Sequence, residues 1–139
     1  MKRVARLLRL DPRQRKLLLE AGALLSAVSP LVRYAPSGVT GRVIRRASVS
    51  NTARTDPQLA ADVAHAVLKV AESVPYSTCL ARALTGWIML ARRRQAATVR
   101  LGVSRAASGI TAHAWLECNG QRVIGGETSH EYIPFPTIP

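Results

Sequence analysis

The sequence is poor in cysteine and aromatic residues, and each shortage excludes a class of protein. Only two cysteines, Cys79 and Cys118, occur among 139 residues, too few for the disulfide framework of a small secreted domain. The six aromatic residues offer little surface for stacking nucleic-acid bases. His65 and His130 have no metal-ligand spacing with either cysteine, so we expect no zinc site and no cofactor.

Acidic residues are also scarce, and the resulting positive charge is concentrated at the N-terminus. Residues 1–54 contain twelve Lys/Arg and two acids, a net charge of +10, whereas residues 55–139 contain eight and six, a net charge of +2. A basic arm attracts nucleic acid, anionic lipid or an acidic peptide or protein, or is simply a solvated helix face. Because Tyr34 is its only aromatic residue, we expect a protein or peptide partner and no DNA.

The chain has no long hydrophobic run. Its longest uncharged stretch, residues 21–32, has twelve residues, fewer than the roughly 20 that span a bilayer. Charged side chains interrupt the apolar N-terminal segment, and no signal-peptidase site follows it. We therefore expect a cytoplasmic protein with reduced thiols and no transmembrane segment.

Start and stop signals predict two helices in the first half of the chain. Asp-Pro pairs at 11–12 and 56–57 each combine an N-cap with a first-turn proline, and apolar residues then recur at helical spacing. Pro30 should end or kink the first helix, and Pro75 should close the second. Residues 35–55, rich in glycine, serine and arginine, are predicted to form a basic connector.

A third helix is predicted to start at Cys79, capped by Ser77 or Thr78. The apolar period then changes to two, which predicts a strand over residues 99–103 and another over 110–118. Asn-Gly at positions 119 and 120 is typical of a two-residue hairpin turn.

These elements predict an α+β fold in which helices are followed by a small antiparallel sheet. We divide the chain into a basic N-terminal helical arm and linker, residues 1–54, and a core, residues 55–139. A leucine stripe in the arm predicts one buried face, either against the core or against a partner protein; it comprises Leu17, Leu18, Leu24 and Leu25.

Cys79 and His113 are the residues most suited to catalysis. A thiol at a helix start experiences the positive end of the helix dipole, which favours the thiolate, and an imidazole beside it can protonate a leaving amine. A helix-starting cysteine followed by a strand histidine is the layout of papain-like and transglutaminase-like thiol enzymes. Alone, each residue has an ordinary structural explanation, but the joint topology favours catalysis. Cys118 shares a strand face with Leu116 and is assigned to the core.

A third group should orient the imidazole of His113. Glu117 is about 13 Å further along the same strand, too far for contact. A regular ladder from the hairpin turn places His113 opposite Gly126, so the neighbouring Glu127 is the best acidic candidate. The alternative is a backbone carbonyl or amide.

The remaining site residues are expected to contact substrate. The backbone N–H of Cys79, aided by Ser77 or Tyr76, would hold the oxyanion. Trp115, on the same strand face as His113, is assigned to substrate binding.

Four segments carry a family resemblance: VPYSTCLARALTGWIMLARRR, VRLGVSR, AHAWLECNGQRVIGG and YIPF. They closely resemble the stand-alone leader peptidases of lasso-peptide biosynthesis, which are themselves similar to the C-terminal half of the microcin-processing protease. The resemblance covers most of residues 56–135. It implies a transglutaminase-like/papain-like core with Cys79 as nucleophile and His113 as base. The acid of that family is usually an aspartate after the next strand, where this chain has VIGGE and its Glu127.

The resemblance also implies a function. A cysteine peptidase of this kind removes the leader of a ribosomal precursor peptide through a thioester, with a separate leader-recognition protein as partner and a lasso cyclase acting afterwards. Two alternatives remain open: acyl transfer to an amine through the same thioester, and a non-catalytic peptide- or nucleic-acid-binding module.

Overall fold

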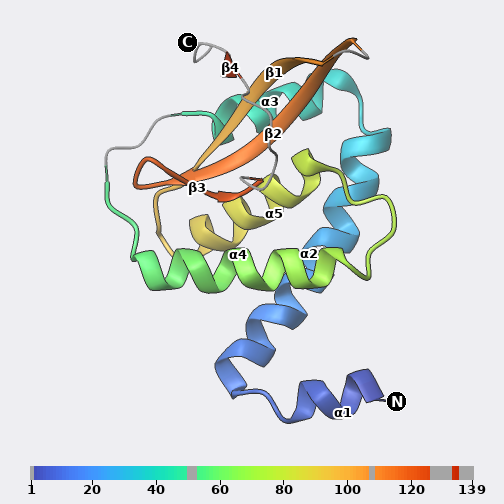
Figure 1. Ribbon diagram of the computed structural model, residues 1–139, viewed down its shortest axis with the longest axis vertical. Helices are drawn as coiled ribbons and strands as arrows, with labels where there is room; N and C mark the ends of the chain where they lie inside the picture. The colour runs from blue at the N-terminus through green and yellow to red at the C-terminus, as the bar shows by residue number, and fades with distance from the viewer. Residues whose placement is uncertain (1, 50–52, 107–108, 126–132, 135–139) are drawn as a thin grey trace.

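The computed structural model describes residues 2–49, 53–106, 109–125 and 133–134, with only the backbone described for 104–106 and 133–134. Helices come first and an antiparallel sheet follows, which is the predicted α+β order (Figure 1). The helices are α1 (Lys2–Leu8), α2 (Pro12–Tyr34), α3 (Ser37–Ala47), α4 (Pro57–Ala71) and α5 (Cys79–Arg92). The strands are β1 (Thr98–Ala106), β2 (Gly109–Cys118), β3 (Gln121–Ile124) and β4 (Ile133–Pro134).

The sheet has the order β3-β2-β1-β4, and its neighbours are antiparallel. The predicted hairpin turn is present: Asn119 and Gly120 have φ of 52° and 77°, as a type I′ turn requires, and Cys118 pairs with Gln121. The expectation of a regular ladder beyond this turn is wrong. A bulge shifts the register, so that Leu116 faces Ile124. The predicted partner of His113, Gly126, lies outside the described residues, as does Glu127.

The core lies between the sheet and the helices. Helix α5 packs against β2 on one side and against α2 and α4 on the other. At the contact with the sheet, Gly86 of α5 lies against Leu116 and Ile124, and a Cβ added to Gly86 would come within 2.6 Å of the Ile124 Cδ1. The absence of a side chain at Gly86 therefore sets how closely the helix approaches β2.

Helix α2 bears on two expectations about the N-terminal arm. It continues through Pro30 to Tyr34, although Pro30 was expected to end or kink it; packing of Leu25 and Val28 in the core accompanies the missing backbone hydrogen bond. By length and composition alone α2 could cross a membrane, a test that buried helices of soluble proteins also pass. Its leucine stripe packs against α4 and α5, so the buried face lies against the core, one of the two predicted alternatives, and not against a partner protein. The boundary between residues 54 and 55 stays a prediction.

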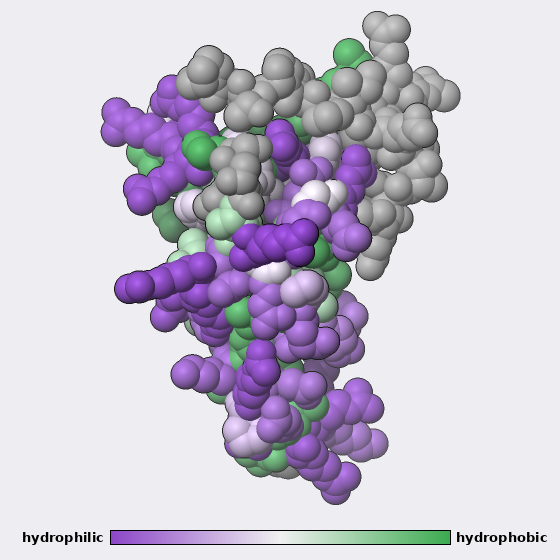
Figure 2. Space-filling view, turned by 90° about the vertical axis from the view of Figure 1, so that its left-hand side faces the viewer, coloured by the Kyte–Doolittle hydropathy of each residue, from purple (hydrophilic) through white to green (hydrophobic). Residues whose placement is uncertain are grey.

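The predicted connector at 35–55 is wrong for its central part, which forms helix α3. The helix is amphipathic: Ala47 is fully buried, Ile44 is half-buried, and the arginines at 42, 45 and 46 point to solvent. The glycine and serine residues of this segment have low helix propensity, which favoured the prediction of a connector over a helix. Figure 2 shows that hydrophilic side chains also cover most of the N-terminal end of the molecule, at the bottom of the view.

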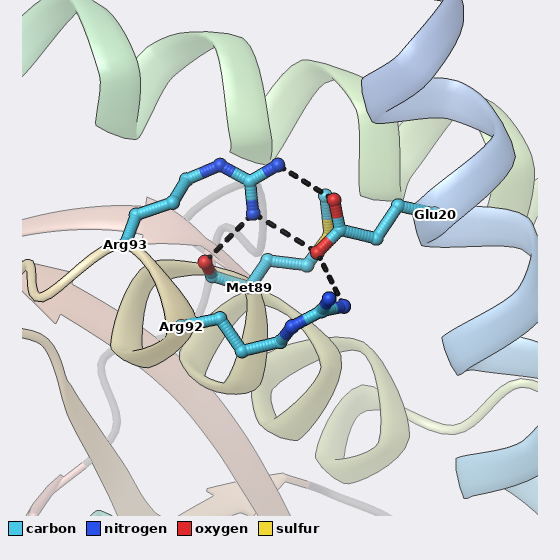
Figure 3. A network of polar contacts seen from close by, with 4 residues as sticks. All are labelled: Glu20, Met89, Arg92 and Arg93. Atoms are coloured by element: carbon cyan, nitrogen blue, oxygen red, sulfur yellow. Dashed lines mark hydrogen bonds and ion pairs between the residues drawn. The ribbon is translucent and has the colours of Figure 1, made fainter.

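An ion-pair network joins α2 to the end of α5 (Figure 3). The Glu20 carboxylate accepts hydrogen bonds from Arg93 at 2.6 and 2.9 Å and from Arg92 at 3.0 Å, while Arg93 also donates to the Met89 carbonyl. The hydrogen bond from Arg93 holds the pKa of Glu20 below its usual value, against the effect of burial. Helix α2 is therefore fastened to the helix that Cys79 begins.

Candidate active site

Cys79 is the first residue of α5, as predicted, and its side chain is half-buried. Thr78 is the N-cap, with its hydroxyl accepting a hydrogen bond from the Ala81 N–H at 3.2 Å. A residue at this first helical position has no carbonyl partner for its N–H within the helix. The helix dipole and this N–H together suit Cys79 to hold a thiolate and to bind a developing oxyanion.

His113 lies on β2, and its ring is held by a backbone carbonyl. Its Nε2 lies 2.9 Å from the Gly125 oxygen, which can only accept, so the ring carries the proton on Nε2 and leaves Nδ1 as the basic nitrogen. A backbone carbonyl was the predicted alternative to Glu127 as the group that orients His113, and the contact with Gly125 is of that kind. Glu127 itself lies beyond the described part of the chain and stays a prediction.

Gly125 is a site residue that sequence reasoning missed. Its φ is +86°, and an added Cβ would lie 3.0 Å from the Ala114 oxygen and 3.2 Å from the His113 Nε2. Both the backbone conformation and the close approach favour glycine here. The consecutive glycines at positions 125 and 126 could have indicated a backbone position that requires glycine.

Trp115 lies beside His113, with ring centroids 6.2 Å apart and planes inclined by 24°. It is only 1% exposed, its indole N–H donates to Glu117 at 2.8 Å, and the Arg122 guanidinium lies 4.3 Å from its ring centroid. The carboxylate of Glu117 also pairs with Arg100 at 3.4 Å. The expected role of Trp115 in substrate binding stays a prediction, and its burial suits a role in supporting the imidazole.

The topology brings Cys79 and His113 to the same level of the molecule. Helix α5 and strand β2 are in contact and run in the same direction in Figure 1. Gly86 lies against Leu116. Cys79 is seven residues before Gly86, about 10 Å along the helix, and His113 is three residues before Leu116, about 10 Å along the strand.

The structure places no hydrogen bond between the described side chains of Cys79 and His113. Alternation along β2 places His113 on the face opposite to Leu116. Catalytic hydrogen bonds often tighten only in the substrate complex, so the pair stays a prediction.

The two other predicted oxyanion residues precede Cys79. Tyr76 is 78% exposed and has a positive φ of 64°. The Ser77 hydroxyl accepts from Nε and Nη2 of Arg82, both at 3.3 Å, which orients its own proton away from the guanidinium and toward another acceptor.

Cys118 is buried in the core, as expected, and burial raises the pKa of its thiol to about 11. It therefore stays protonated near neutral pH. No group of three or more His, Cys, Asp or Glu side chains arranged to hold a metal ion lies among the residues that the structure describes.

A family model for the transglutaminase-like superfamily matches residues 23–136, or 114 of the 139 residues. The chain belongs to the transglutaminase-like superfamily. This superfamily includes cysteine peptidases and acyltransferases, and its members are commonly cysteine-dependent enzymes. The match begins within α2, in agreement with the packing of that helix on α5. No curated protein and no solved structure matches the chain.

Proposed function

We propose that this protein is a cytoplasmic cysteine peptidase that removes the leader from a lasso-type ribosomal precursor peptide. The observation that carries the proposal is the position of Cys79 at the capped start of α5 in a transglutaminase-like domain. The sequence motifs around Cys79 and His113 support the choice of substrate, because they resemble lasso leader peptidases.

The mechanism uses a covalent thioester. The Cys79 thiolate attacks the scissile carbonyl carbon, and the Cys79 N–H and the Ser77 hydroxyl stabilise the oxyanion. The C–N bond then breaks, and the leaving amine takes a proton from the His113 imidazolium. Water next attacks the thioester as His113 accepts its proton, which releases the carboxylic acid and restores the thiolate.

The leader-recognition protein would meet the basic N-terminal helices. Arg15 is occupied there, because its guanidinium donates to the carbonyls of Leu7, Leu8 and Leu10 at the end of α1. The exposed arginines Arg42 and Arg45 of α3 are better placed to face an acidic partner.

The test is cleavage of the precursor peptide in the presence of its leader-recognition protein, followed by mass spectrometry. Cys79→Ala and His113→Ala should each abolish cleavage, since residues that act as one catalytic unit lose nearly the whole effect singly. Cys118→Ala is the matched control and should cleave. An active, folded Cys79→Ala protein would overturn the peptidase.

The identity of the third residue is tested by a pair of carboxamide variants. Glu127→Gln should slow turnover if that carboxylate orients His113, whereas Glu117→Gln should do less. Unchanged turnover in Glu127→Gln would assign the orienting role to the Gly125 carbonyl alone.

The same thioester could instead pass its acyl group to an amine, which is the second activity found in the superfamily. Adding an excess of a small primary amine to the reaction separates the two. A peptidase gives mainly the free acid of the leader, whereas a transferase gives mainly the amide.

A further inference from the structure

Two exposed tyrosines surround Arg33 where the end of α2 meets the loop before Cys79. The Arg33 guanidinium carbon lies 5.6 Å from the Tyr34 ring centroid and 5.3 Å from that of Tyr76. Both distances are within the range of cation–π attraction. Tyr34 and Tyr76 are 76% and 78% exposed, so this cluster of three residues, which we call the arginine clamp, is open to solvent.

The arginine clamp holds a cation that the fold itself does not neutralise. The ion pairs of the described residues involve Arg13, Lys69, Arg92, Arg93 and Arg100, and Arg33 is not among them. Cation–π attraction uses none of the guanidinium hydrogen-bond donors, so the N–H groups of Arg33 can still bind a ligand. A guanidinium restrained in this way is suited to a bidentate hydrogen bond with a carboxylate.

The position of Tyr76 connects the clamp to the reaction. Its φ of 64° is rare for a residue other than glycine, and such strained residues cluster at functional sites. Tyr76 is three residues before Cys79, so their Cα atoms lie within about 10 Å. Adding the length of the tyrosine side chain and the 5.3 Å contact places the guanidinium within about six extended peptide residues of the thiol.

We propose that Arg33, restrained by Tyr34 and Tyr76, binds the side-chain carboxylate of an aspartate or glutamate of the peptide substrate. The bound residue lies several positions from the cleaved bond, and the contact selects acidic peptides and sets their register on Cys79. The proposal deepens the proposed function, since it concerns the substrate of the same site.

The test measures binding separately from catalysis. Fluorescein-labelled twelve-residue peptides of Gly, Ala, Ser and Thr, each with one glutamate at a different position, are titrated with the Cys79→Ala protein and followed by anisotropy. One or two adjacent glutamate positions should tighten binding about three- to tenfold over the matching glutamine peptides. Arg33→Gln should remove this preference, and Arg33→Lys should retain less than half of it on a logarithmic scale, because lysine lacks the planar fork.

Arg6→Gln is the matched control, because it removes the same charge from a residue of α1 that is not part of the clamp. It should leave the preference for the best glutamate position intact. The proposal is overturned if no glutamate position improves binding more than twofold, or if the preference survives in Arg33→Gln.

The two proposals can fail separately. If the glutamate preference is present and depends on Arg33 but the parent protein cleaves no peptide, the peptidase is wrong and the clamp stands. If the parent protein cleaves the precursor but no glutamate position improves binding, or the preference survives in Arg33→Gln, the clamp is wrong and the peptidase stands.

Discussion

Replacing Gly125 by alanine tests whether the carbonyl that holds His113 matters for the reaction. The backbone φ of +86° costs alanine about 1–2 kcal/mol. The new Cβ would also lie 3.0 Å from the Ala114 oxygen, a backbone atom of β2 that cannot easily move, and overpacking of this kind costs about 1–3 kcal/mol. We therefore expect Gly125→Ala to lose about 3 kcal/mol of unfolding free energy, which lowers Tm by about 10 °C for a chain of this length.

Gly125→Ala should also cleave more slowly while it remains folded. The same Cβ would lie 3.2 Å from the His113 Nε2, so the imidazole must move and its hydrogen bond to Gly125 must lengthen. A displacement of about 1 Å in a catalytic group can cost about a hundredfold in rate. The contact at 3.2 Å requires a shift of only a few tenths of an ångström, so cleavage by Gly125→Ala, measured at a temperature where the protein stays folded, should fall by a smaller factor, roughly three- to tenfold.

Gly120→Ala is the matched control for this experiment. Gly120 also has a positive φ, +77°, but an added Cβ would meet nothing within 4 Å. This variant should lose only about 1–2 kcal/mol and cleave at nearly the parent rate. Long-range nitrogen–proton NMR of His113 should show the Nε2–H form in Gly120→Ala and a changed tautomer mixture in Gly125→Ala. Equal rates and equal Tm shifts in the two variants would refute the role assigned to Gly125.

Three further predictions concern the thiols and the packing of α5. Iodoacetamide at pH 7.5 should modify Cys79 alone in the folded protein, because Cys118 is buried and its pKa is raised to about 11; equal labelling of both would contradict this. Glu20→Gln should lose about 1–3 kcal/mol of unfolding free energy at pH 7. Because the folded-state pKa of Glu20 is lowered, this difference should be present above about pH 4.3 and vanish as pH falls through the folded-state value, as urea titrations can show. Gly86→Ala should be destabilising by about 1–3 kcal/mol despite better helix propensity, since its Cβ would meet buried Ile124 and Leu116; an unchanged Tm would mean that the sheet can yield.

Features set by neighbouring residues were predictable from the sequence. The Thr78 hydroxyl caps α5 and the Asp56 carboxylate caps α4, and each hydrogen bond spans only two or three residues. The Asn-Gly turn and the Cys118–Gln121 pair follow from the backbone conformations that these residue types allow. Asp11 marks a helix start in the same way, although its side chain makes no capping hydrogen bond.

Features that depend on tertiary contacts were not predictable. Pro30 was expected to end or kink α2, and it does not end the helix; burial of Val28 and its neighbours accompanies the continuation to Tyr34. Helix α3 has few helix-favouring residues and is held by a single buried position, Ala47, against the rest of the fold. The bulge at Leu116 depends on how β2 and β3 pair. It shifts the register, so counting residues regularly from the hairpin turn does not give the partner of His113.

Helix α2 contacts residues at both ends of α5, so the basic arm is more than a docking surface. Near its start, Glu20 fastens it to Arg93 at the end of α5. At its other end, Arg33 lies against Tyr76, in the loop that leads into Cys79. A helix held at both places restrains the position of the nucleophile along the α5 axis. Because α1 buries none of its residues whereas α2 packs on α4 and α5, the part of the arm that belongs to the packed fold begins at α2.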